Sequence, residues 1–329
     1  MVVPEVDISI LDLAMIGSDE SVADSFAASV TLAQHAEKWG FHRLWYAEHH
    51  NMGSIASSAT SVLIGHIAAN TSTIRVGAGG VMLPNHSPLV IAEQFGTLET
   101  LFPGRIDLGL GRAPGTDQNT LRALRRDPTS ADRFPHDVVE LRGYLSGESA
   151  VPGVRAVPGK GTHVPLYILG SSLFGARLAA QLGLPYAFAS HFAPDALTSA
   201  VALYRKEFRP SEQCEKPHVM AGVNVVAADS SRDAEHFFAD ALKYRAARFF
   251  GKGRRFTPDE IDLLMDSPAG DQVRHMAQYS AVGTGADVRD YLEEFAELAM
   301  ADELIILSAA LDRDAWLGSV ETVAEVCGL

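Results

Sequence analysis

The sequence predicts an α/β protein built as a (β/α)₈ TIM barrel. Eight short apolar runs alternate with longer stretches of helical periodicity, and both kinds of segment spread evenly along the 329 residues. Such alternation is typical of a parallel sheet. A doubly wound open sheet alternates in the same way, so the closed barrel is favoured by the count of eight and by the even spread.

The eight predicted strands are runs rich in Ile, Val, Leu, Tyr and Phe, the residue types that favour strands. In chain order they cover residues 7–16, 42–47, 74–83, 105–111, 165–170, 186–190, 218–227 and 303–308. Active sites of such barrels lie at the C-terminal ends of the strands, so the search for chemistry starts there.

Several of the predicted helices have a marked start. Ser21 is followed by Asp24, Ser87 precedes Pro88 as an N-cap before proline, and Pro194-Asp195 repeats that pattern. The helices cover residues 21–39, 57–70, 88–102, 133–146, 173–182, 194–208, 231–249, 287–299 and 312–326.

We expect one barrel domain over residues 1–329 with an insertion at about 251–280, before the last β/α unit. The insertion should hold a short helix, and its Gly-flanked, charged sequence makes it a candidate for part of a lid. A second long loop, residues 112–132, follows the fourth strand.

Charge and composition exclude several classes of protein. The chain has 27 basic and 41 acidic residues, a net charge of −14, so we expect no nucleic-acid partner. Glu5 and Asp7 stand where a signal peptide would be basic, and no apolar run approaches the ~18 residues of a membrane span, so we expect a cytoplasmic protein without membrane association. Cys214 and Cys327 lie far apart, in no redox or zinc-binding spacing.

Polar residues follow the second predicted strand at Glu48, His49, His50 and Asn51. In one interpretation, one histidine is a hydrogen-bonded core residue and the other is solvated. Metal binding is not favoured, because adjacent residues on extended chain point in opposite directions and no H-x-x-x-H or H-E-x-x-H spacing occurs. A single histidine acting as proton donor or acceptor fits better, since its unperturbed pKa of roughly 6.5 suits that role.

The third predicted strand contains Gly77, Gly79 and Gly80. Glycines inside a strand weaken it, and they usually mark a bulge or a place where another group approaches the backbone closely. A planar ring is one candidate for that group. The alternative is that small residues are needed here to pack the layers of the barrel.

Two neighbouring strand ends together predict a phosphate clamp. Arg112 follows the fourth strand, where it can meet an anion or form a salt bridge to a nearby loop. Ser171 and Ser172 follow the fifth strand and lead directly into a helix that contains Gly175. Free N–H groups and hydroxyls at a helix start are typical of phosphate-binding sites.

Four stretches of the chain, residues 45–51, 77–88, 105–117 and 169–185, resemble the bacterial luciferase-like, flavin-dependent monooxygenases. Within that family the sequence is most similar to the group with the Ala-Glu-His-His motif. The resemblance spans nearly the whole chain. It implies an eight-stranded barrel with an insertion before the final unit, which agrees with the independent count of strands.

By position, the resemblance implies that His49 lies near the reactive C4a edge of a flavin mononucleotide, with Glu48 and His50 in support. It implies a non-proline cis peptide at Gly79-Gly80 beneath the flavin.

Arg112 matches the family arginine that contacts the cofactor, and Ser171, Ser172 and Gly175 match the phosphate loop. Arg122 and Arg133 both remain candidates for a second phosphate-binding arginine.

The implied activity is a two-component monooxygenase. A separate flavin reductase delivers reduced FMN, molecular oxygen adds to give a C4a-hydroperoxyflavin, and a small apolar organic substrate such as an aldehyde or aromatic polyketide is oxygenated. Met15, Met82 and Phe192 are candidates to line the substrate pocket. The family alone also implies a homodimer.

Three alternatives stay open. One is hydride transfer with a deazaflavin or FMN, and another is a flavin-binding protein without catalysis. An aldolase- or hydrolase-type barrel is less favoured, because the sequence has no obvious strand-end lysine and no carboxylate-rich metal site.

Overall fold

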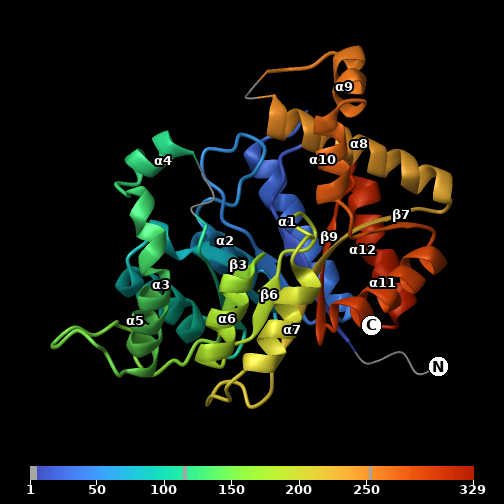
Figure 1. The fold of residues 1–329 in the computed structure, drawn as a ribbon. Helices are drawn as coiled ribbons and strands as arrows, with labels where there is room; N and C mark the ends of the chain where they lie inside the picture. The colour runs from blue at the N-terminus through green and yellow to red at the C-terminus, as the bar shows by residue number, and fades with distance from the viewer. Residues whose placement is uncertain (1–5, 114–116, 252–253) are drawn as a thin grey trace.

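A computed structural model describes residues 6–113, 117–251 and 254–329 (Figure 1). Eight parallel strands form a closed barrel and confirm the eight predicted ones. They are β1 Asp7–Asp12, β2 Arg43–Tyr46, β3 Arg75–Met82, β4 Ile106–Gly111, β5 Leu166–Gly170, β6 Tyr186–Phe188, β7 Val219–Ala227 and β9 Glu303–Ser308. The sheet closes because β1 pairs with both β2 and β9, while β7 pairs with both β6 and β9.

A short additional strand, β8 Ser280–Gly283, was not predicted. It pairs with the second half of β7, from Asn224↔Ser280 to Ala227↔Gly283, whereas β6 pairs with the first half of the same strand. Strand β8 thus extends the barrel wall above the point where β6 ends.

Eight helices form the outer ring and cover the strands. They are α1 Val22–Trp39, α2 Thr60–Ala69, α3 Pro88–Leu101, α5 Phe134–Ser146, α6 Leu173–Leu182, α7 Leu197–Glu207, α11 Gly285–Ala299 and α12 Arg313–Cys327. All of them overlap predicted helices.

The structure confirms some of the predicted helix starts and not others. Ser21 and Asp24 form a full capping box, as expected. Ser87 does stand at the N-cap of α3 before Pro88, but its side chain makes no capping hydrogen bond. The start predicted at Pro194 is wrong, because the Leu197 N–H donates to the Pro194 carbonyl and closes a turn before α7 begins.

The insertion before the last β/α unit is present. Between β7 and α11 the chain forms α8 Ser231–Phe250, α9 Pro258–Met265 and α10 Pro268–Met276, two short helices in place of the expected one. These three elements lie together at the top of Figure 1. The loop after β4 holds α4 Gln118–Ala123 and a 3₁₀ turn, η2 Pro128–Arg133, and a second 3₁₀ turn, η1 Leu83–Asn85, follows β3.

Two predictions fall partly outside the described residues, namely the acidic N-terminus at Glu5 and the part of the predicted loop 112–132 that covers residues 114–116. Within the described ranges, no helix combines the length and apolar character that a membrane crossing requires.

The barrel interior is layered along its axis. Its middle is an apolar cluster that includes Leu11, Trp45, Tyr167 and Met220. Below it, at the N-terminal ends of the strands, lies a buried polar group that we call the barrel-floor network, made of Arg43, Arg75, Asp107, Tyr167 and Glu303.

Charges of both signs meet in the barrel-floor network. Arg43 Nη1 lies 2.8 Å from Asp107 Oδ2, and Arg43 Nε lies 2.9 Å from Glu303 Oε1. Arg75 pairs with the other oxygen of Asp107. This end of the barrel is therefore filled and closed by matched charges.

Candidate active site at the barrel mouth

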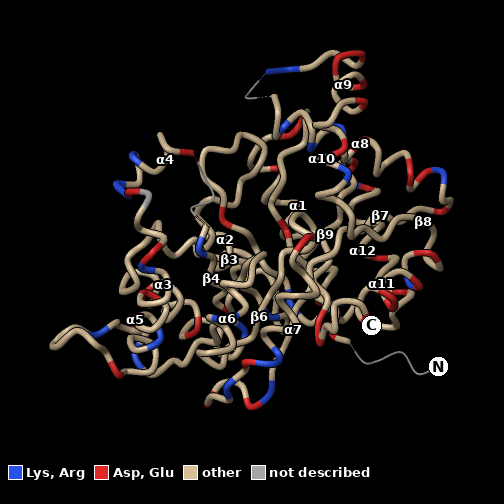
Figure 2. The backbone as a smooth tube through the Cα atoms, viewed as in Figure 1, with Lys and Arg blue, Asp and Glu red and all other residues tan. Residues whose placement is uncertain are grey.

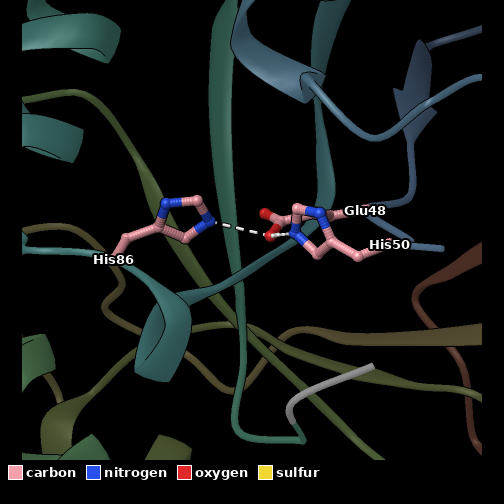
Figure 3. A group of neighbouring side chains, drawn as sticks. All are labelled: Glu48, His50 and His86. Atoms are coloured by element: carbon pink, nitrogen blue, oxygen red, sulfur yellow. Dashed lines mark hydrogen bonds and ion pairs between the residues drawn. The ribbon is translucent and has the colours of Figure 1, made fainter. Parts of the chain in front are cut away.

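Glu48 is the centre of one polar group at the C-terminal end of the strands (Figure 3). Its buried carboxylate lies 2.7 Å from His50 Nε2 and 2.7 Å from His86 Nε2, and it accepts a 3.1 Å hydrogen bond from the Met82 N–H. Burial opposes ionisation of Glu48, but the hydrogen bonds from His50 and His86 outweigh it and lower its pKa to about 2. Glu48 is therefore a fixed anion at neutral pH.

His86 was not singled out from the sequence, although it lies within the stretch 77–88 that carries the family resemblance. It follows η1, which turns the chain back toward Glu48 after β3. Ligand atoms of Glu48, His50 and His86 lie within 4.8 Å of one another, so the group has a spacing that could also hold a metal ion. Its hydrogen bonds already account for the arrangement without one.

His49 has no hydrogen-bond partner for one ring nitrogen in the described part of the chain. Within the described part of the chain, His49 Nδ1 is buried and makes no hydrogen bond. Burial and the positive charge of Arg248 lower the pKa of His49 to about 4. The imidazole is therefore neutral near pH 7, and a neutral imidazole has one donor and one acceptor nitrogen.

Gly79 and Gly80 lie in a bulge of β3, where the register with β4 shifts between Ala78 and Val81. The peptide bond between the two glycines is cis, as the resemblance implied. A Cβ on Gly80 would lie 2.7 Å from the Gly109 carbonyl oxygen, and one on Gly79 would lie 3.0 Å from Trp45 Cβ. Packing of the barrel wall alone therefore requires a residue without a side chain at Gly80.

The residues predicted to clamp a phosphate lie near one another. The Arg112 guanidinium carbon lies 4.3 Å from the centre of the Phe174 ring, in the first turn of α6, which places Arg112 beside Ser171 and Ser172. Ser172 is the N-cap residue of α6, but its side chain makes no capping bond. A Cβ on Gly175 would meet Tyr186 Cε2 at 3.4 Å, an ordinary contact, so packing does not require glycine there.

Arg122 and Arg133, the two candidates for a second phosphate-binding arginine, are both exposed. Arg133 Nε lies 3.5 Å from Asp137 Oδ1. Arg126, which sequence reasoning missed, donates to the Asn85 carbonyl at 3.2 Å. Arg126 and Arg133 both line a pocket of about 350 Å³ that also includes His86.

A second polar group lies at the mouth, and we call it the mouth cluster: His49, His191, Asn224, Arg245 and Arg248. Of these residues the sequence analysis had singled out His49 and missed the other four. Asn224 Nδ2 donates to the His191 carbonyl at 2.8 Å, and Arg245 Nη2 donates to Asn224 Oδ1 at 3.2 Å. Burial and the charge of Arg245 lower the pKa of His191 to about 3, and His49 adds to this effect. The only sequence signal was the i, i+3 spacing of the two arginines, which puts them on one face of α8.

Comparison with known proteins places this geometry in a family. A family model described as luciferase-like monooxygenase matches residues 6–302. A luciferase-like monooxygenase of Escherichia coli (strain K12) is 50% identical over 321 residues, covering 97% of this chain and 96% of that protein. An N-acetyl-S-alkylcysteine monooxygenase of Bacillus subtilis (strain 168) is 42% identical over 187 residues, covering 55% and 56% of the two chains.

Among solved structures, apo-MsnO8 matches with a TM-score of 0.89 at 35% identity and covers 99% of both chains. The oxygenating constituent of 3,6-diketocamphane monooxygenase of Pseudomonas putida, in complex with FMN, has a TM-score of 0.72 at 16% identity, covering 97% of both chains. An F420-dependent secondary alcohol dehydrogenase has a TM-score of 0.71 at 17% identity, covering 97% of this chain and 99% of that one. These last two likenesses show the fold alone. The match of the family model over residues 6–302, together with the 50% identical relative that covers 97% of the chain, establishes that this chain belongs to the luciferase-like monooxygenase family.

Proposed function

We propose that this protein is a monooxygenase that binds reduced FMN, delivered by a separate flavin reductase, and uses molecular oxygen to oxygenate a small organic substrate. The observation that carries the proposal is the meeting, at one end of the barrel, of a phosphate clamp, a side-chain-free stretch of wall and a histidine with an unpaired buried nitrogen.

The residues at the mouth fit the cofactor. Arg112 and the N–H groups and hydroxyls of Ser171 and Ser172 would hold its phosphate. The Gly79-Gly80 segment would present bare backbone to the flat ring, and Gly175 would leave room at the clamp. When bound, reduced FMN would supply the electrons that activate oxygen.

His49 is the candidate catalytic residue. Its unpaired Nδ1 would hold or move a proton at the reacting atoms, as a neutral imidazole at physiological pH. Glu48 is a positioning residue in this proposal, since its carboxylate fixes His50, His86 and the Met82 peptide around the loop that carries His49.

The substrate side of the proposal rests on Met15, Met82 and Phe192, which would meet the oxidisable, apolar part of the molecule. The segment 251–280 would act as part of the lid, and a homodimer is the proposed assembly. If the segment could be deleted without faster release of hydrogen peroxide, the lid assignment would be wrong.

The test is a titration of the purified protein with oxidised FMN, reduced FMN and a deazaflavin, in wild type, Arg112→Ala and Arg289→Ala. Arg289 is an exposed arginine of α11 that pairs with Glu293 and serves as the control. We expect preferential binding of reduced FMN, weakened in Arg112→Ala by at least ~1.5 kcal/mol, as for a charged hydrogen bond. A preference for the deazaflavin, with Arg112 irrelevant, would favour hydride transfer and contradict the proposal.

A further inference from the structure

The mouth cluster contains two arginines without an acidic partner among the described residues. Arg245 and Arg248 lie on α8, and neither forms an ion pair with any carboxylate in the described part of the chain. Arg245 meets only the His191 carbonyl, at 3.4 Å, and Asn224 Oδ1, at 3.2 Å. Arg248 meets Met52 Sδ at 2.9 Å, and thioether sulfur is a weak acceptor.

This lack of counter-charge is unusual in so acidic a protein. The chain has a net charge of −14, and acidic positions are spread over outer helices such as α9 and α11 (Figure 2). The two arginines inside the barrel do find acids: Arg43 pairs with Asp107 and Glu303, and Arg75 pairs with Asp107. Arg245 and Arg248 are half-buried, and a partly desolvated charge without a counter-ion costs stability, so their presence at the mouth points to a ligand that supplies the partner.

The local field is suited to an anion. Burial and the neighbouring Arg248 lower the pKa of Arg245 to about 10, so each guanidinium already disfavours the other. Each guanidinium has five N–H donors in a planar fork, and the contacts above engage two in Arg245 and one in Arg248. The remaining donors match the oxygens of a carboxylate or similar oxyanion.

We propose that Arg245 and Arg248 form an anion subsite that holds a carboxylate or equivalent oxyanion group of the organic substrate beside His49. This inference rests on the proposed function and refines it: the substrate carries a negatively charged head in addition to its apolar part. The cofactor phosphate is not the occupant, because its clamp follows β4 and β5, whereas α8 follows β7 and its Arg248 reaches the loop after β2.

Asn224 positions the subsite. Its Oδ1 accepts from Arg245, while its Nδ2 donates to the His191 carbonyl at 2.8 Å and to Ser280 Oγ at 3.2 Å. Asn224 is also where β8 begins to pair with β7. The extra strand returned by the insertion therefore buttresses the residue that orients Arg245.

The experiment compares carboxylic acids with their matched primary amides. Acetate, hexanoate, octanoate and N-acetylmethionine, each with its amide, are titrated by calorimetry into the FMN-loaded protein. The variants are Arg245→Gln, Arg248→Gln and, as the control, the exposed Arg289→Gln. We expect the longer acids to bind at least about tenfold more tightly than their amides, a preference lost in the first two variants and kept in the control. Arg248→Lys keeps the positive charge but loses the planar set of guanidinium donors, so it should keep part of the preference for acids over amides.

The outcomes separate this inference from the proposed function. If wild type shows no preference for acids, or if Arg245→Gln and Arg248→Gln both retain it, the subsite is refuted. If these variants instead weaken FMN as strongly as Arg112→Ala does, the arginines serve the cofactor and the substrate assignment is overturned. If wild type binds no FMN, the proposed function fails, while the acid and amide titrations of the flavin-free protein still test the subsite.

Discussion

The two ends of the barrel treat arginine in opposite ways. At the floor, Arg43 and Arg75 meet Asp107 and Glu303 in a closed network, with no side-chain exposure of either acid. At the mouth, Arg245 and Arg248 meet a carbonyl, an amide and a thioether. The floor is complete without a ligand, whereas the mouth keeps unmatched charge. The contrast indicates that the floor serves stability and that the mouth serves binding.

The largest expected effect comes from unbalancing the floor. Asp107→Asn leaves Arg75 without an acidic partner within the described ranges and Arg43 with Glu303 alone, and it should lower the free energy of unfolding by about 3–5 kcal/mol, because a buried charge loses its partner. Chemical denaturation measures it. Asp271→Asn, which breaks an exposed pair with Arg274, is the control and should cost about 1 kcal/mol or less. If Asp107→Asn and Asp271→Asn lost equal free energy of unfolding, the barrel-floor network would not be a special source of stability.

Two glycines sharpen the same contrast. Gly80→Ala puts a Cβ against the Gly109 backbone in the barrel wall and should destabilise by roughly 1–3 kcal/mol. In Gly175→Ala the new Cβ meets Tyr186 and Gly170 at ordinary distances, so stability should not fall, while FMN binding should weaken. Thermal unfolding and FMN titration measure the two effects. A Gly175→Ala protein that is less stable than Gly80→Ala would contradict this assignment of roles.

Removing a charge at the mouth should affect the free energy of unfolding differently from removing a charge at the floor. Arg245→Gln relieves an unpaired cation, so the free energy of unfolding of the ligand-free protein should be unchanged or higher by about 1 kcal/mol. Denaturant unfolding beside Asp107→Asn tests this. A loss as large as that of Asp107→Asn would mean that Arg245 is structural.

The smallest effect is a shift in the titration of His49. Its pKa lies at about 4, below the ordinary 6.5, so the unfolded chain binds more protons between these values and stability falls as the pH falls through this window. Arg248→Gln should raise the pKa of His49 and reduce that loss. Histidine resonances followed by NMR against pH measure the change. An unmoved His49 in Arg248→Gln would show that the arginine does not act on it.

The sequence predicted the barrel well because its strands are buried on both faces and read as apolar runs. Strand β8 escaped because Ser-Ala-Val-Gly is too short and too mixed to stand out. The start of α7 was predicted too early. Pro194 lies in a turn just before the helix, and in the sequence such a proline looks the same as one in the first turn of a helix.

The site was predictable where it lies in one stretch of chain and obscure where the barrel assembles it. Glu48, His49 and His50 are contiguous, and the Ser171 to Gly175 loop reads as a helix start. His86 and Arg245 come from elements that only the closed sheet brings to the same mouth. The role of His86 depends on its contact with Glu48, and that of Arg245 on the absence of an acidic partner in the described part of the chain. No spacing in the sequence reveals either.

The most direct test of the central claim is the fate of oxygen at the site. Protein loaded anaerobically with reduced FMN is mixed with oxygenated buffer, and hydrogen peroxide release is followed against free reduced FMN, in wild type and His49→Ala. We predict release at least about tenfold slower from wild type than from free reduced FMN, and faster release in His49→Ala, since this histidine would manage the proton at the reacting atoms. Release at the rate of free reduced FMN, or no effect of His49→Ala, would contradict a monooxygenase built on this site.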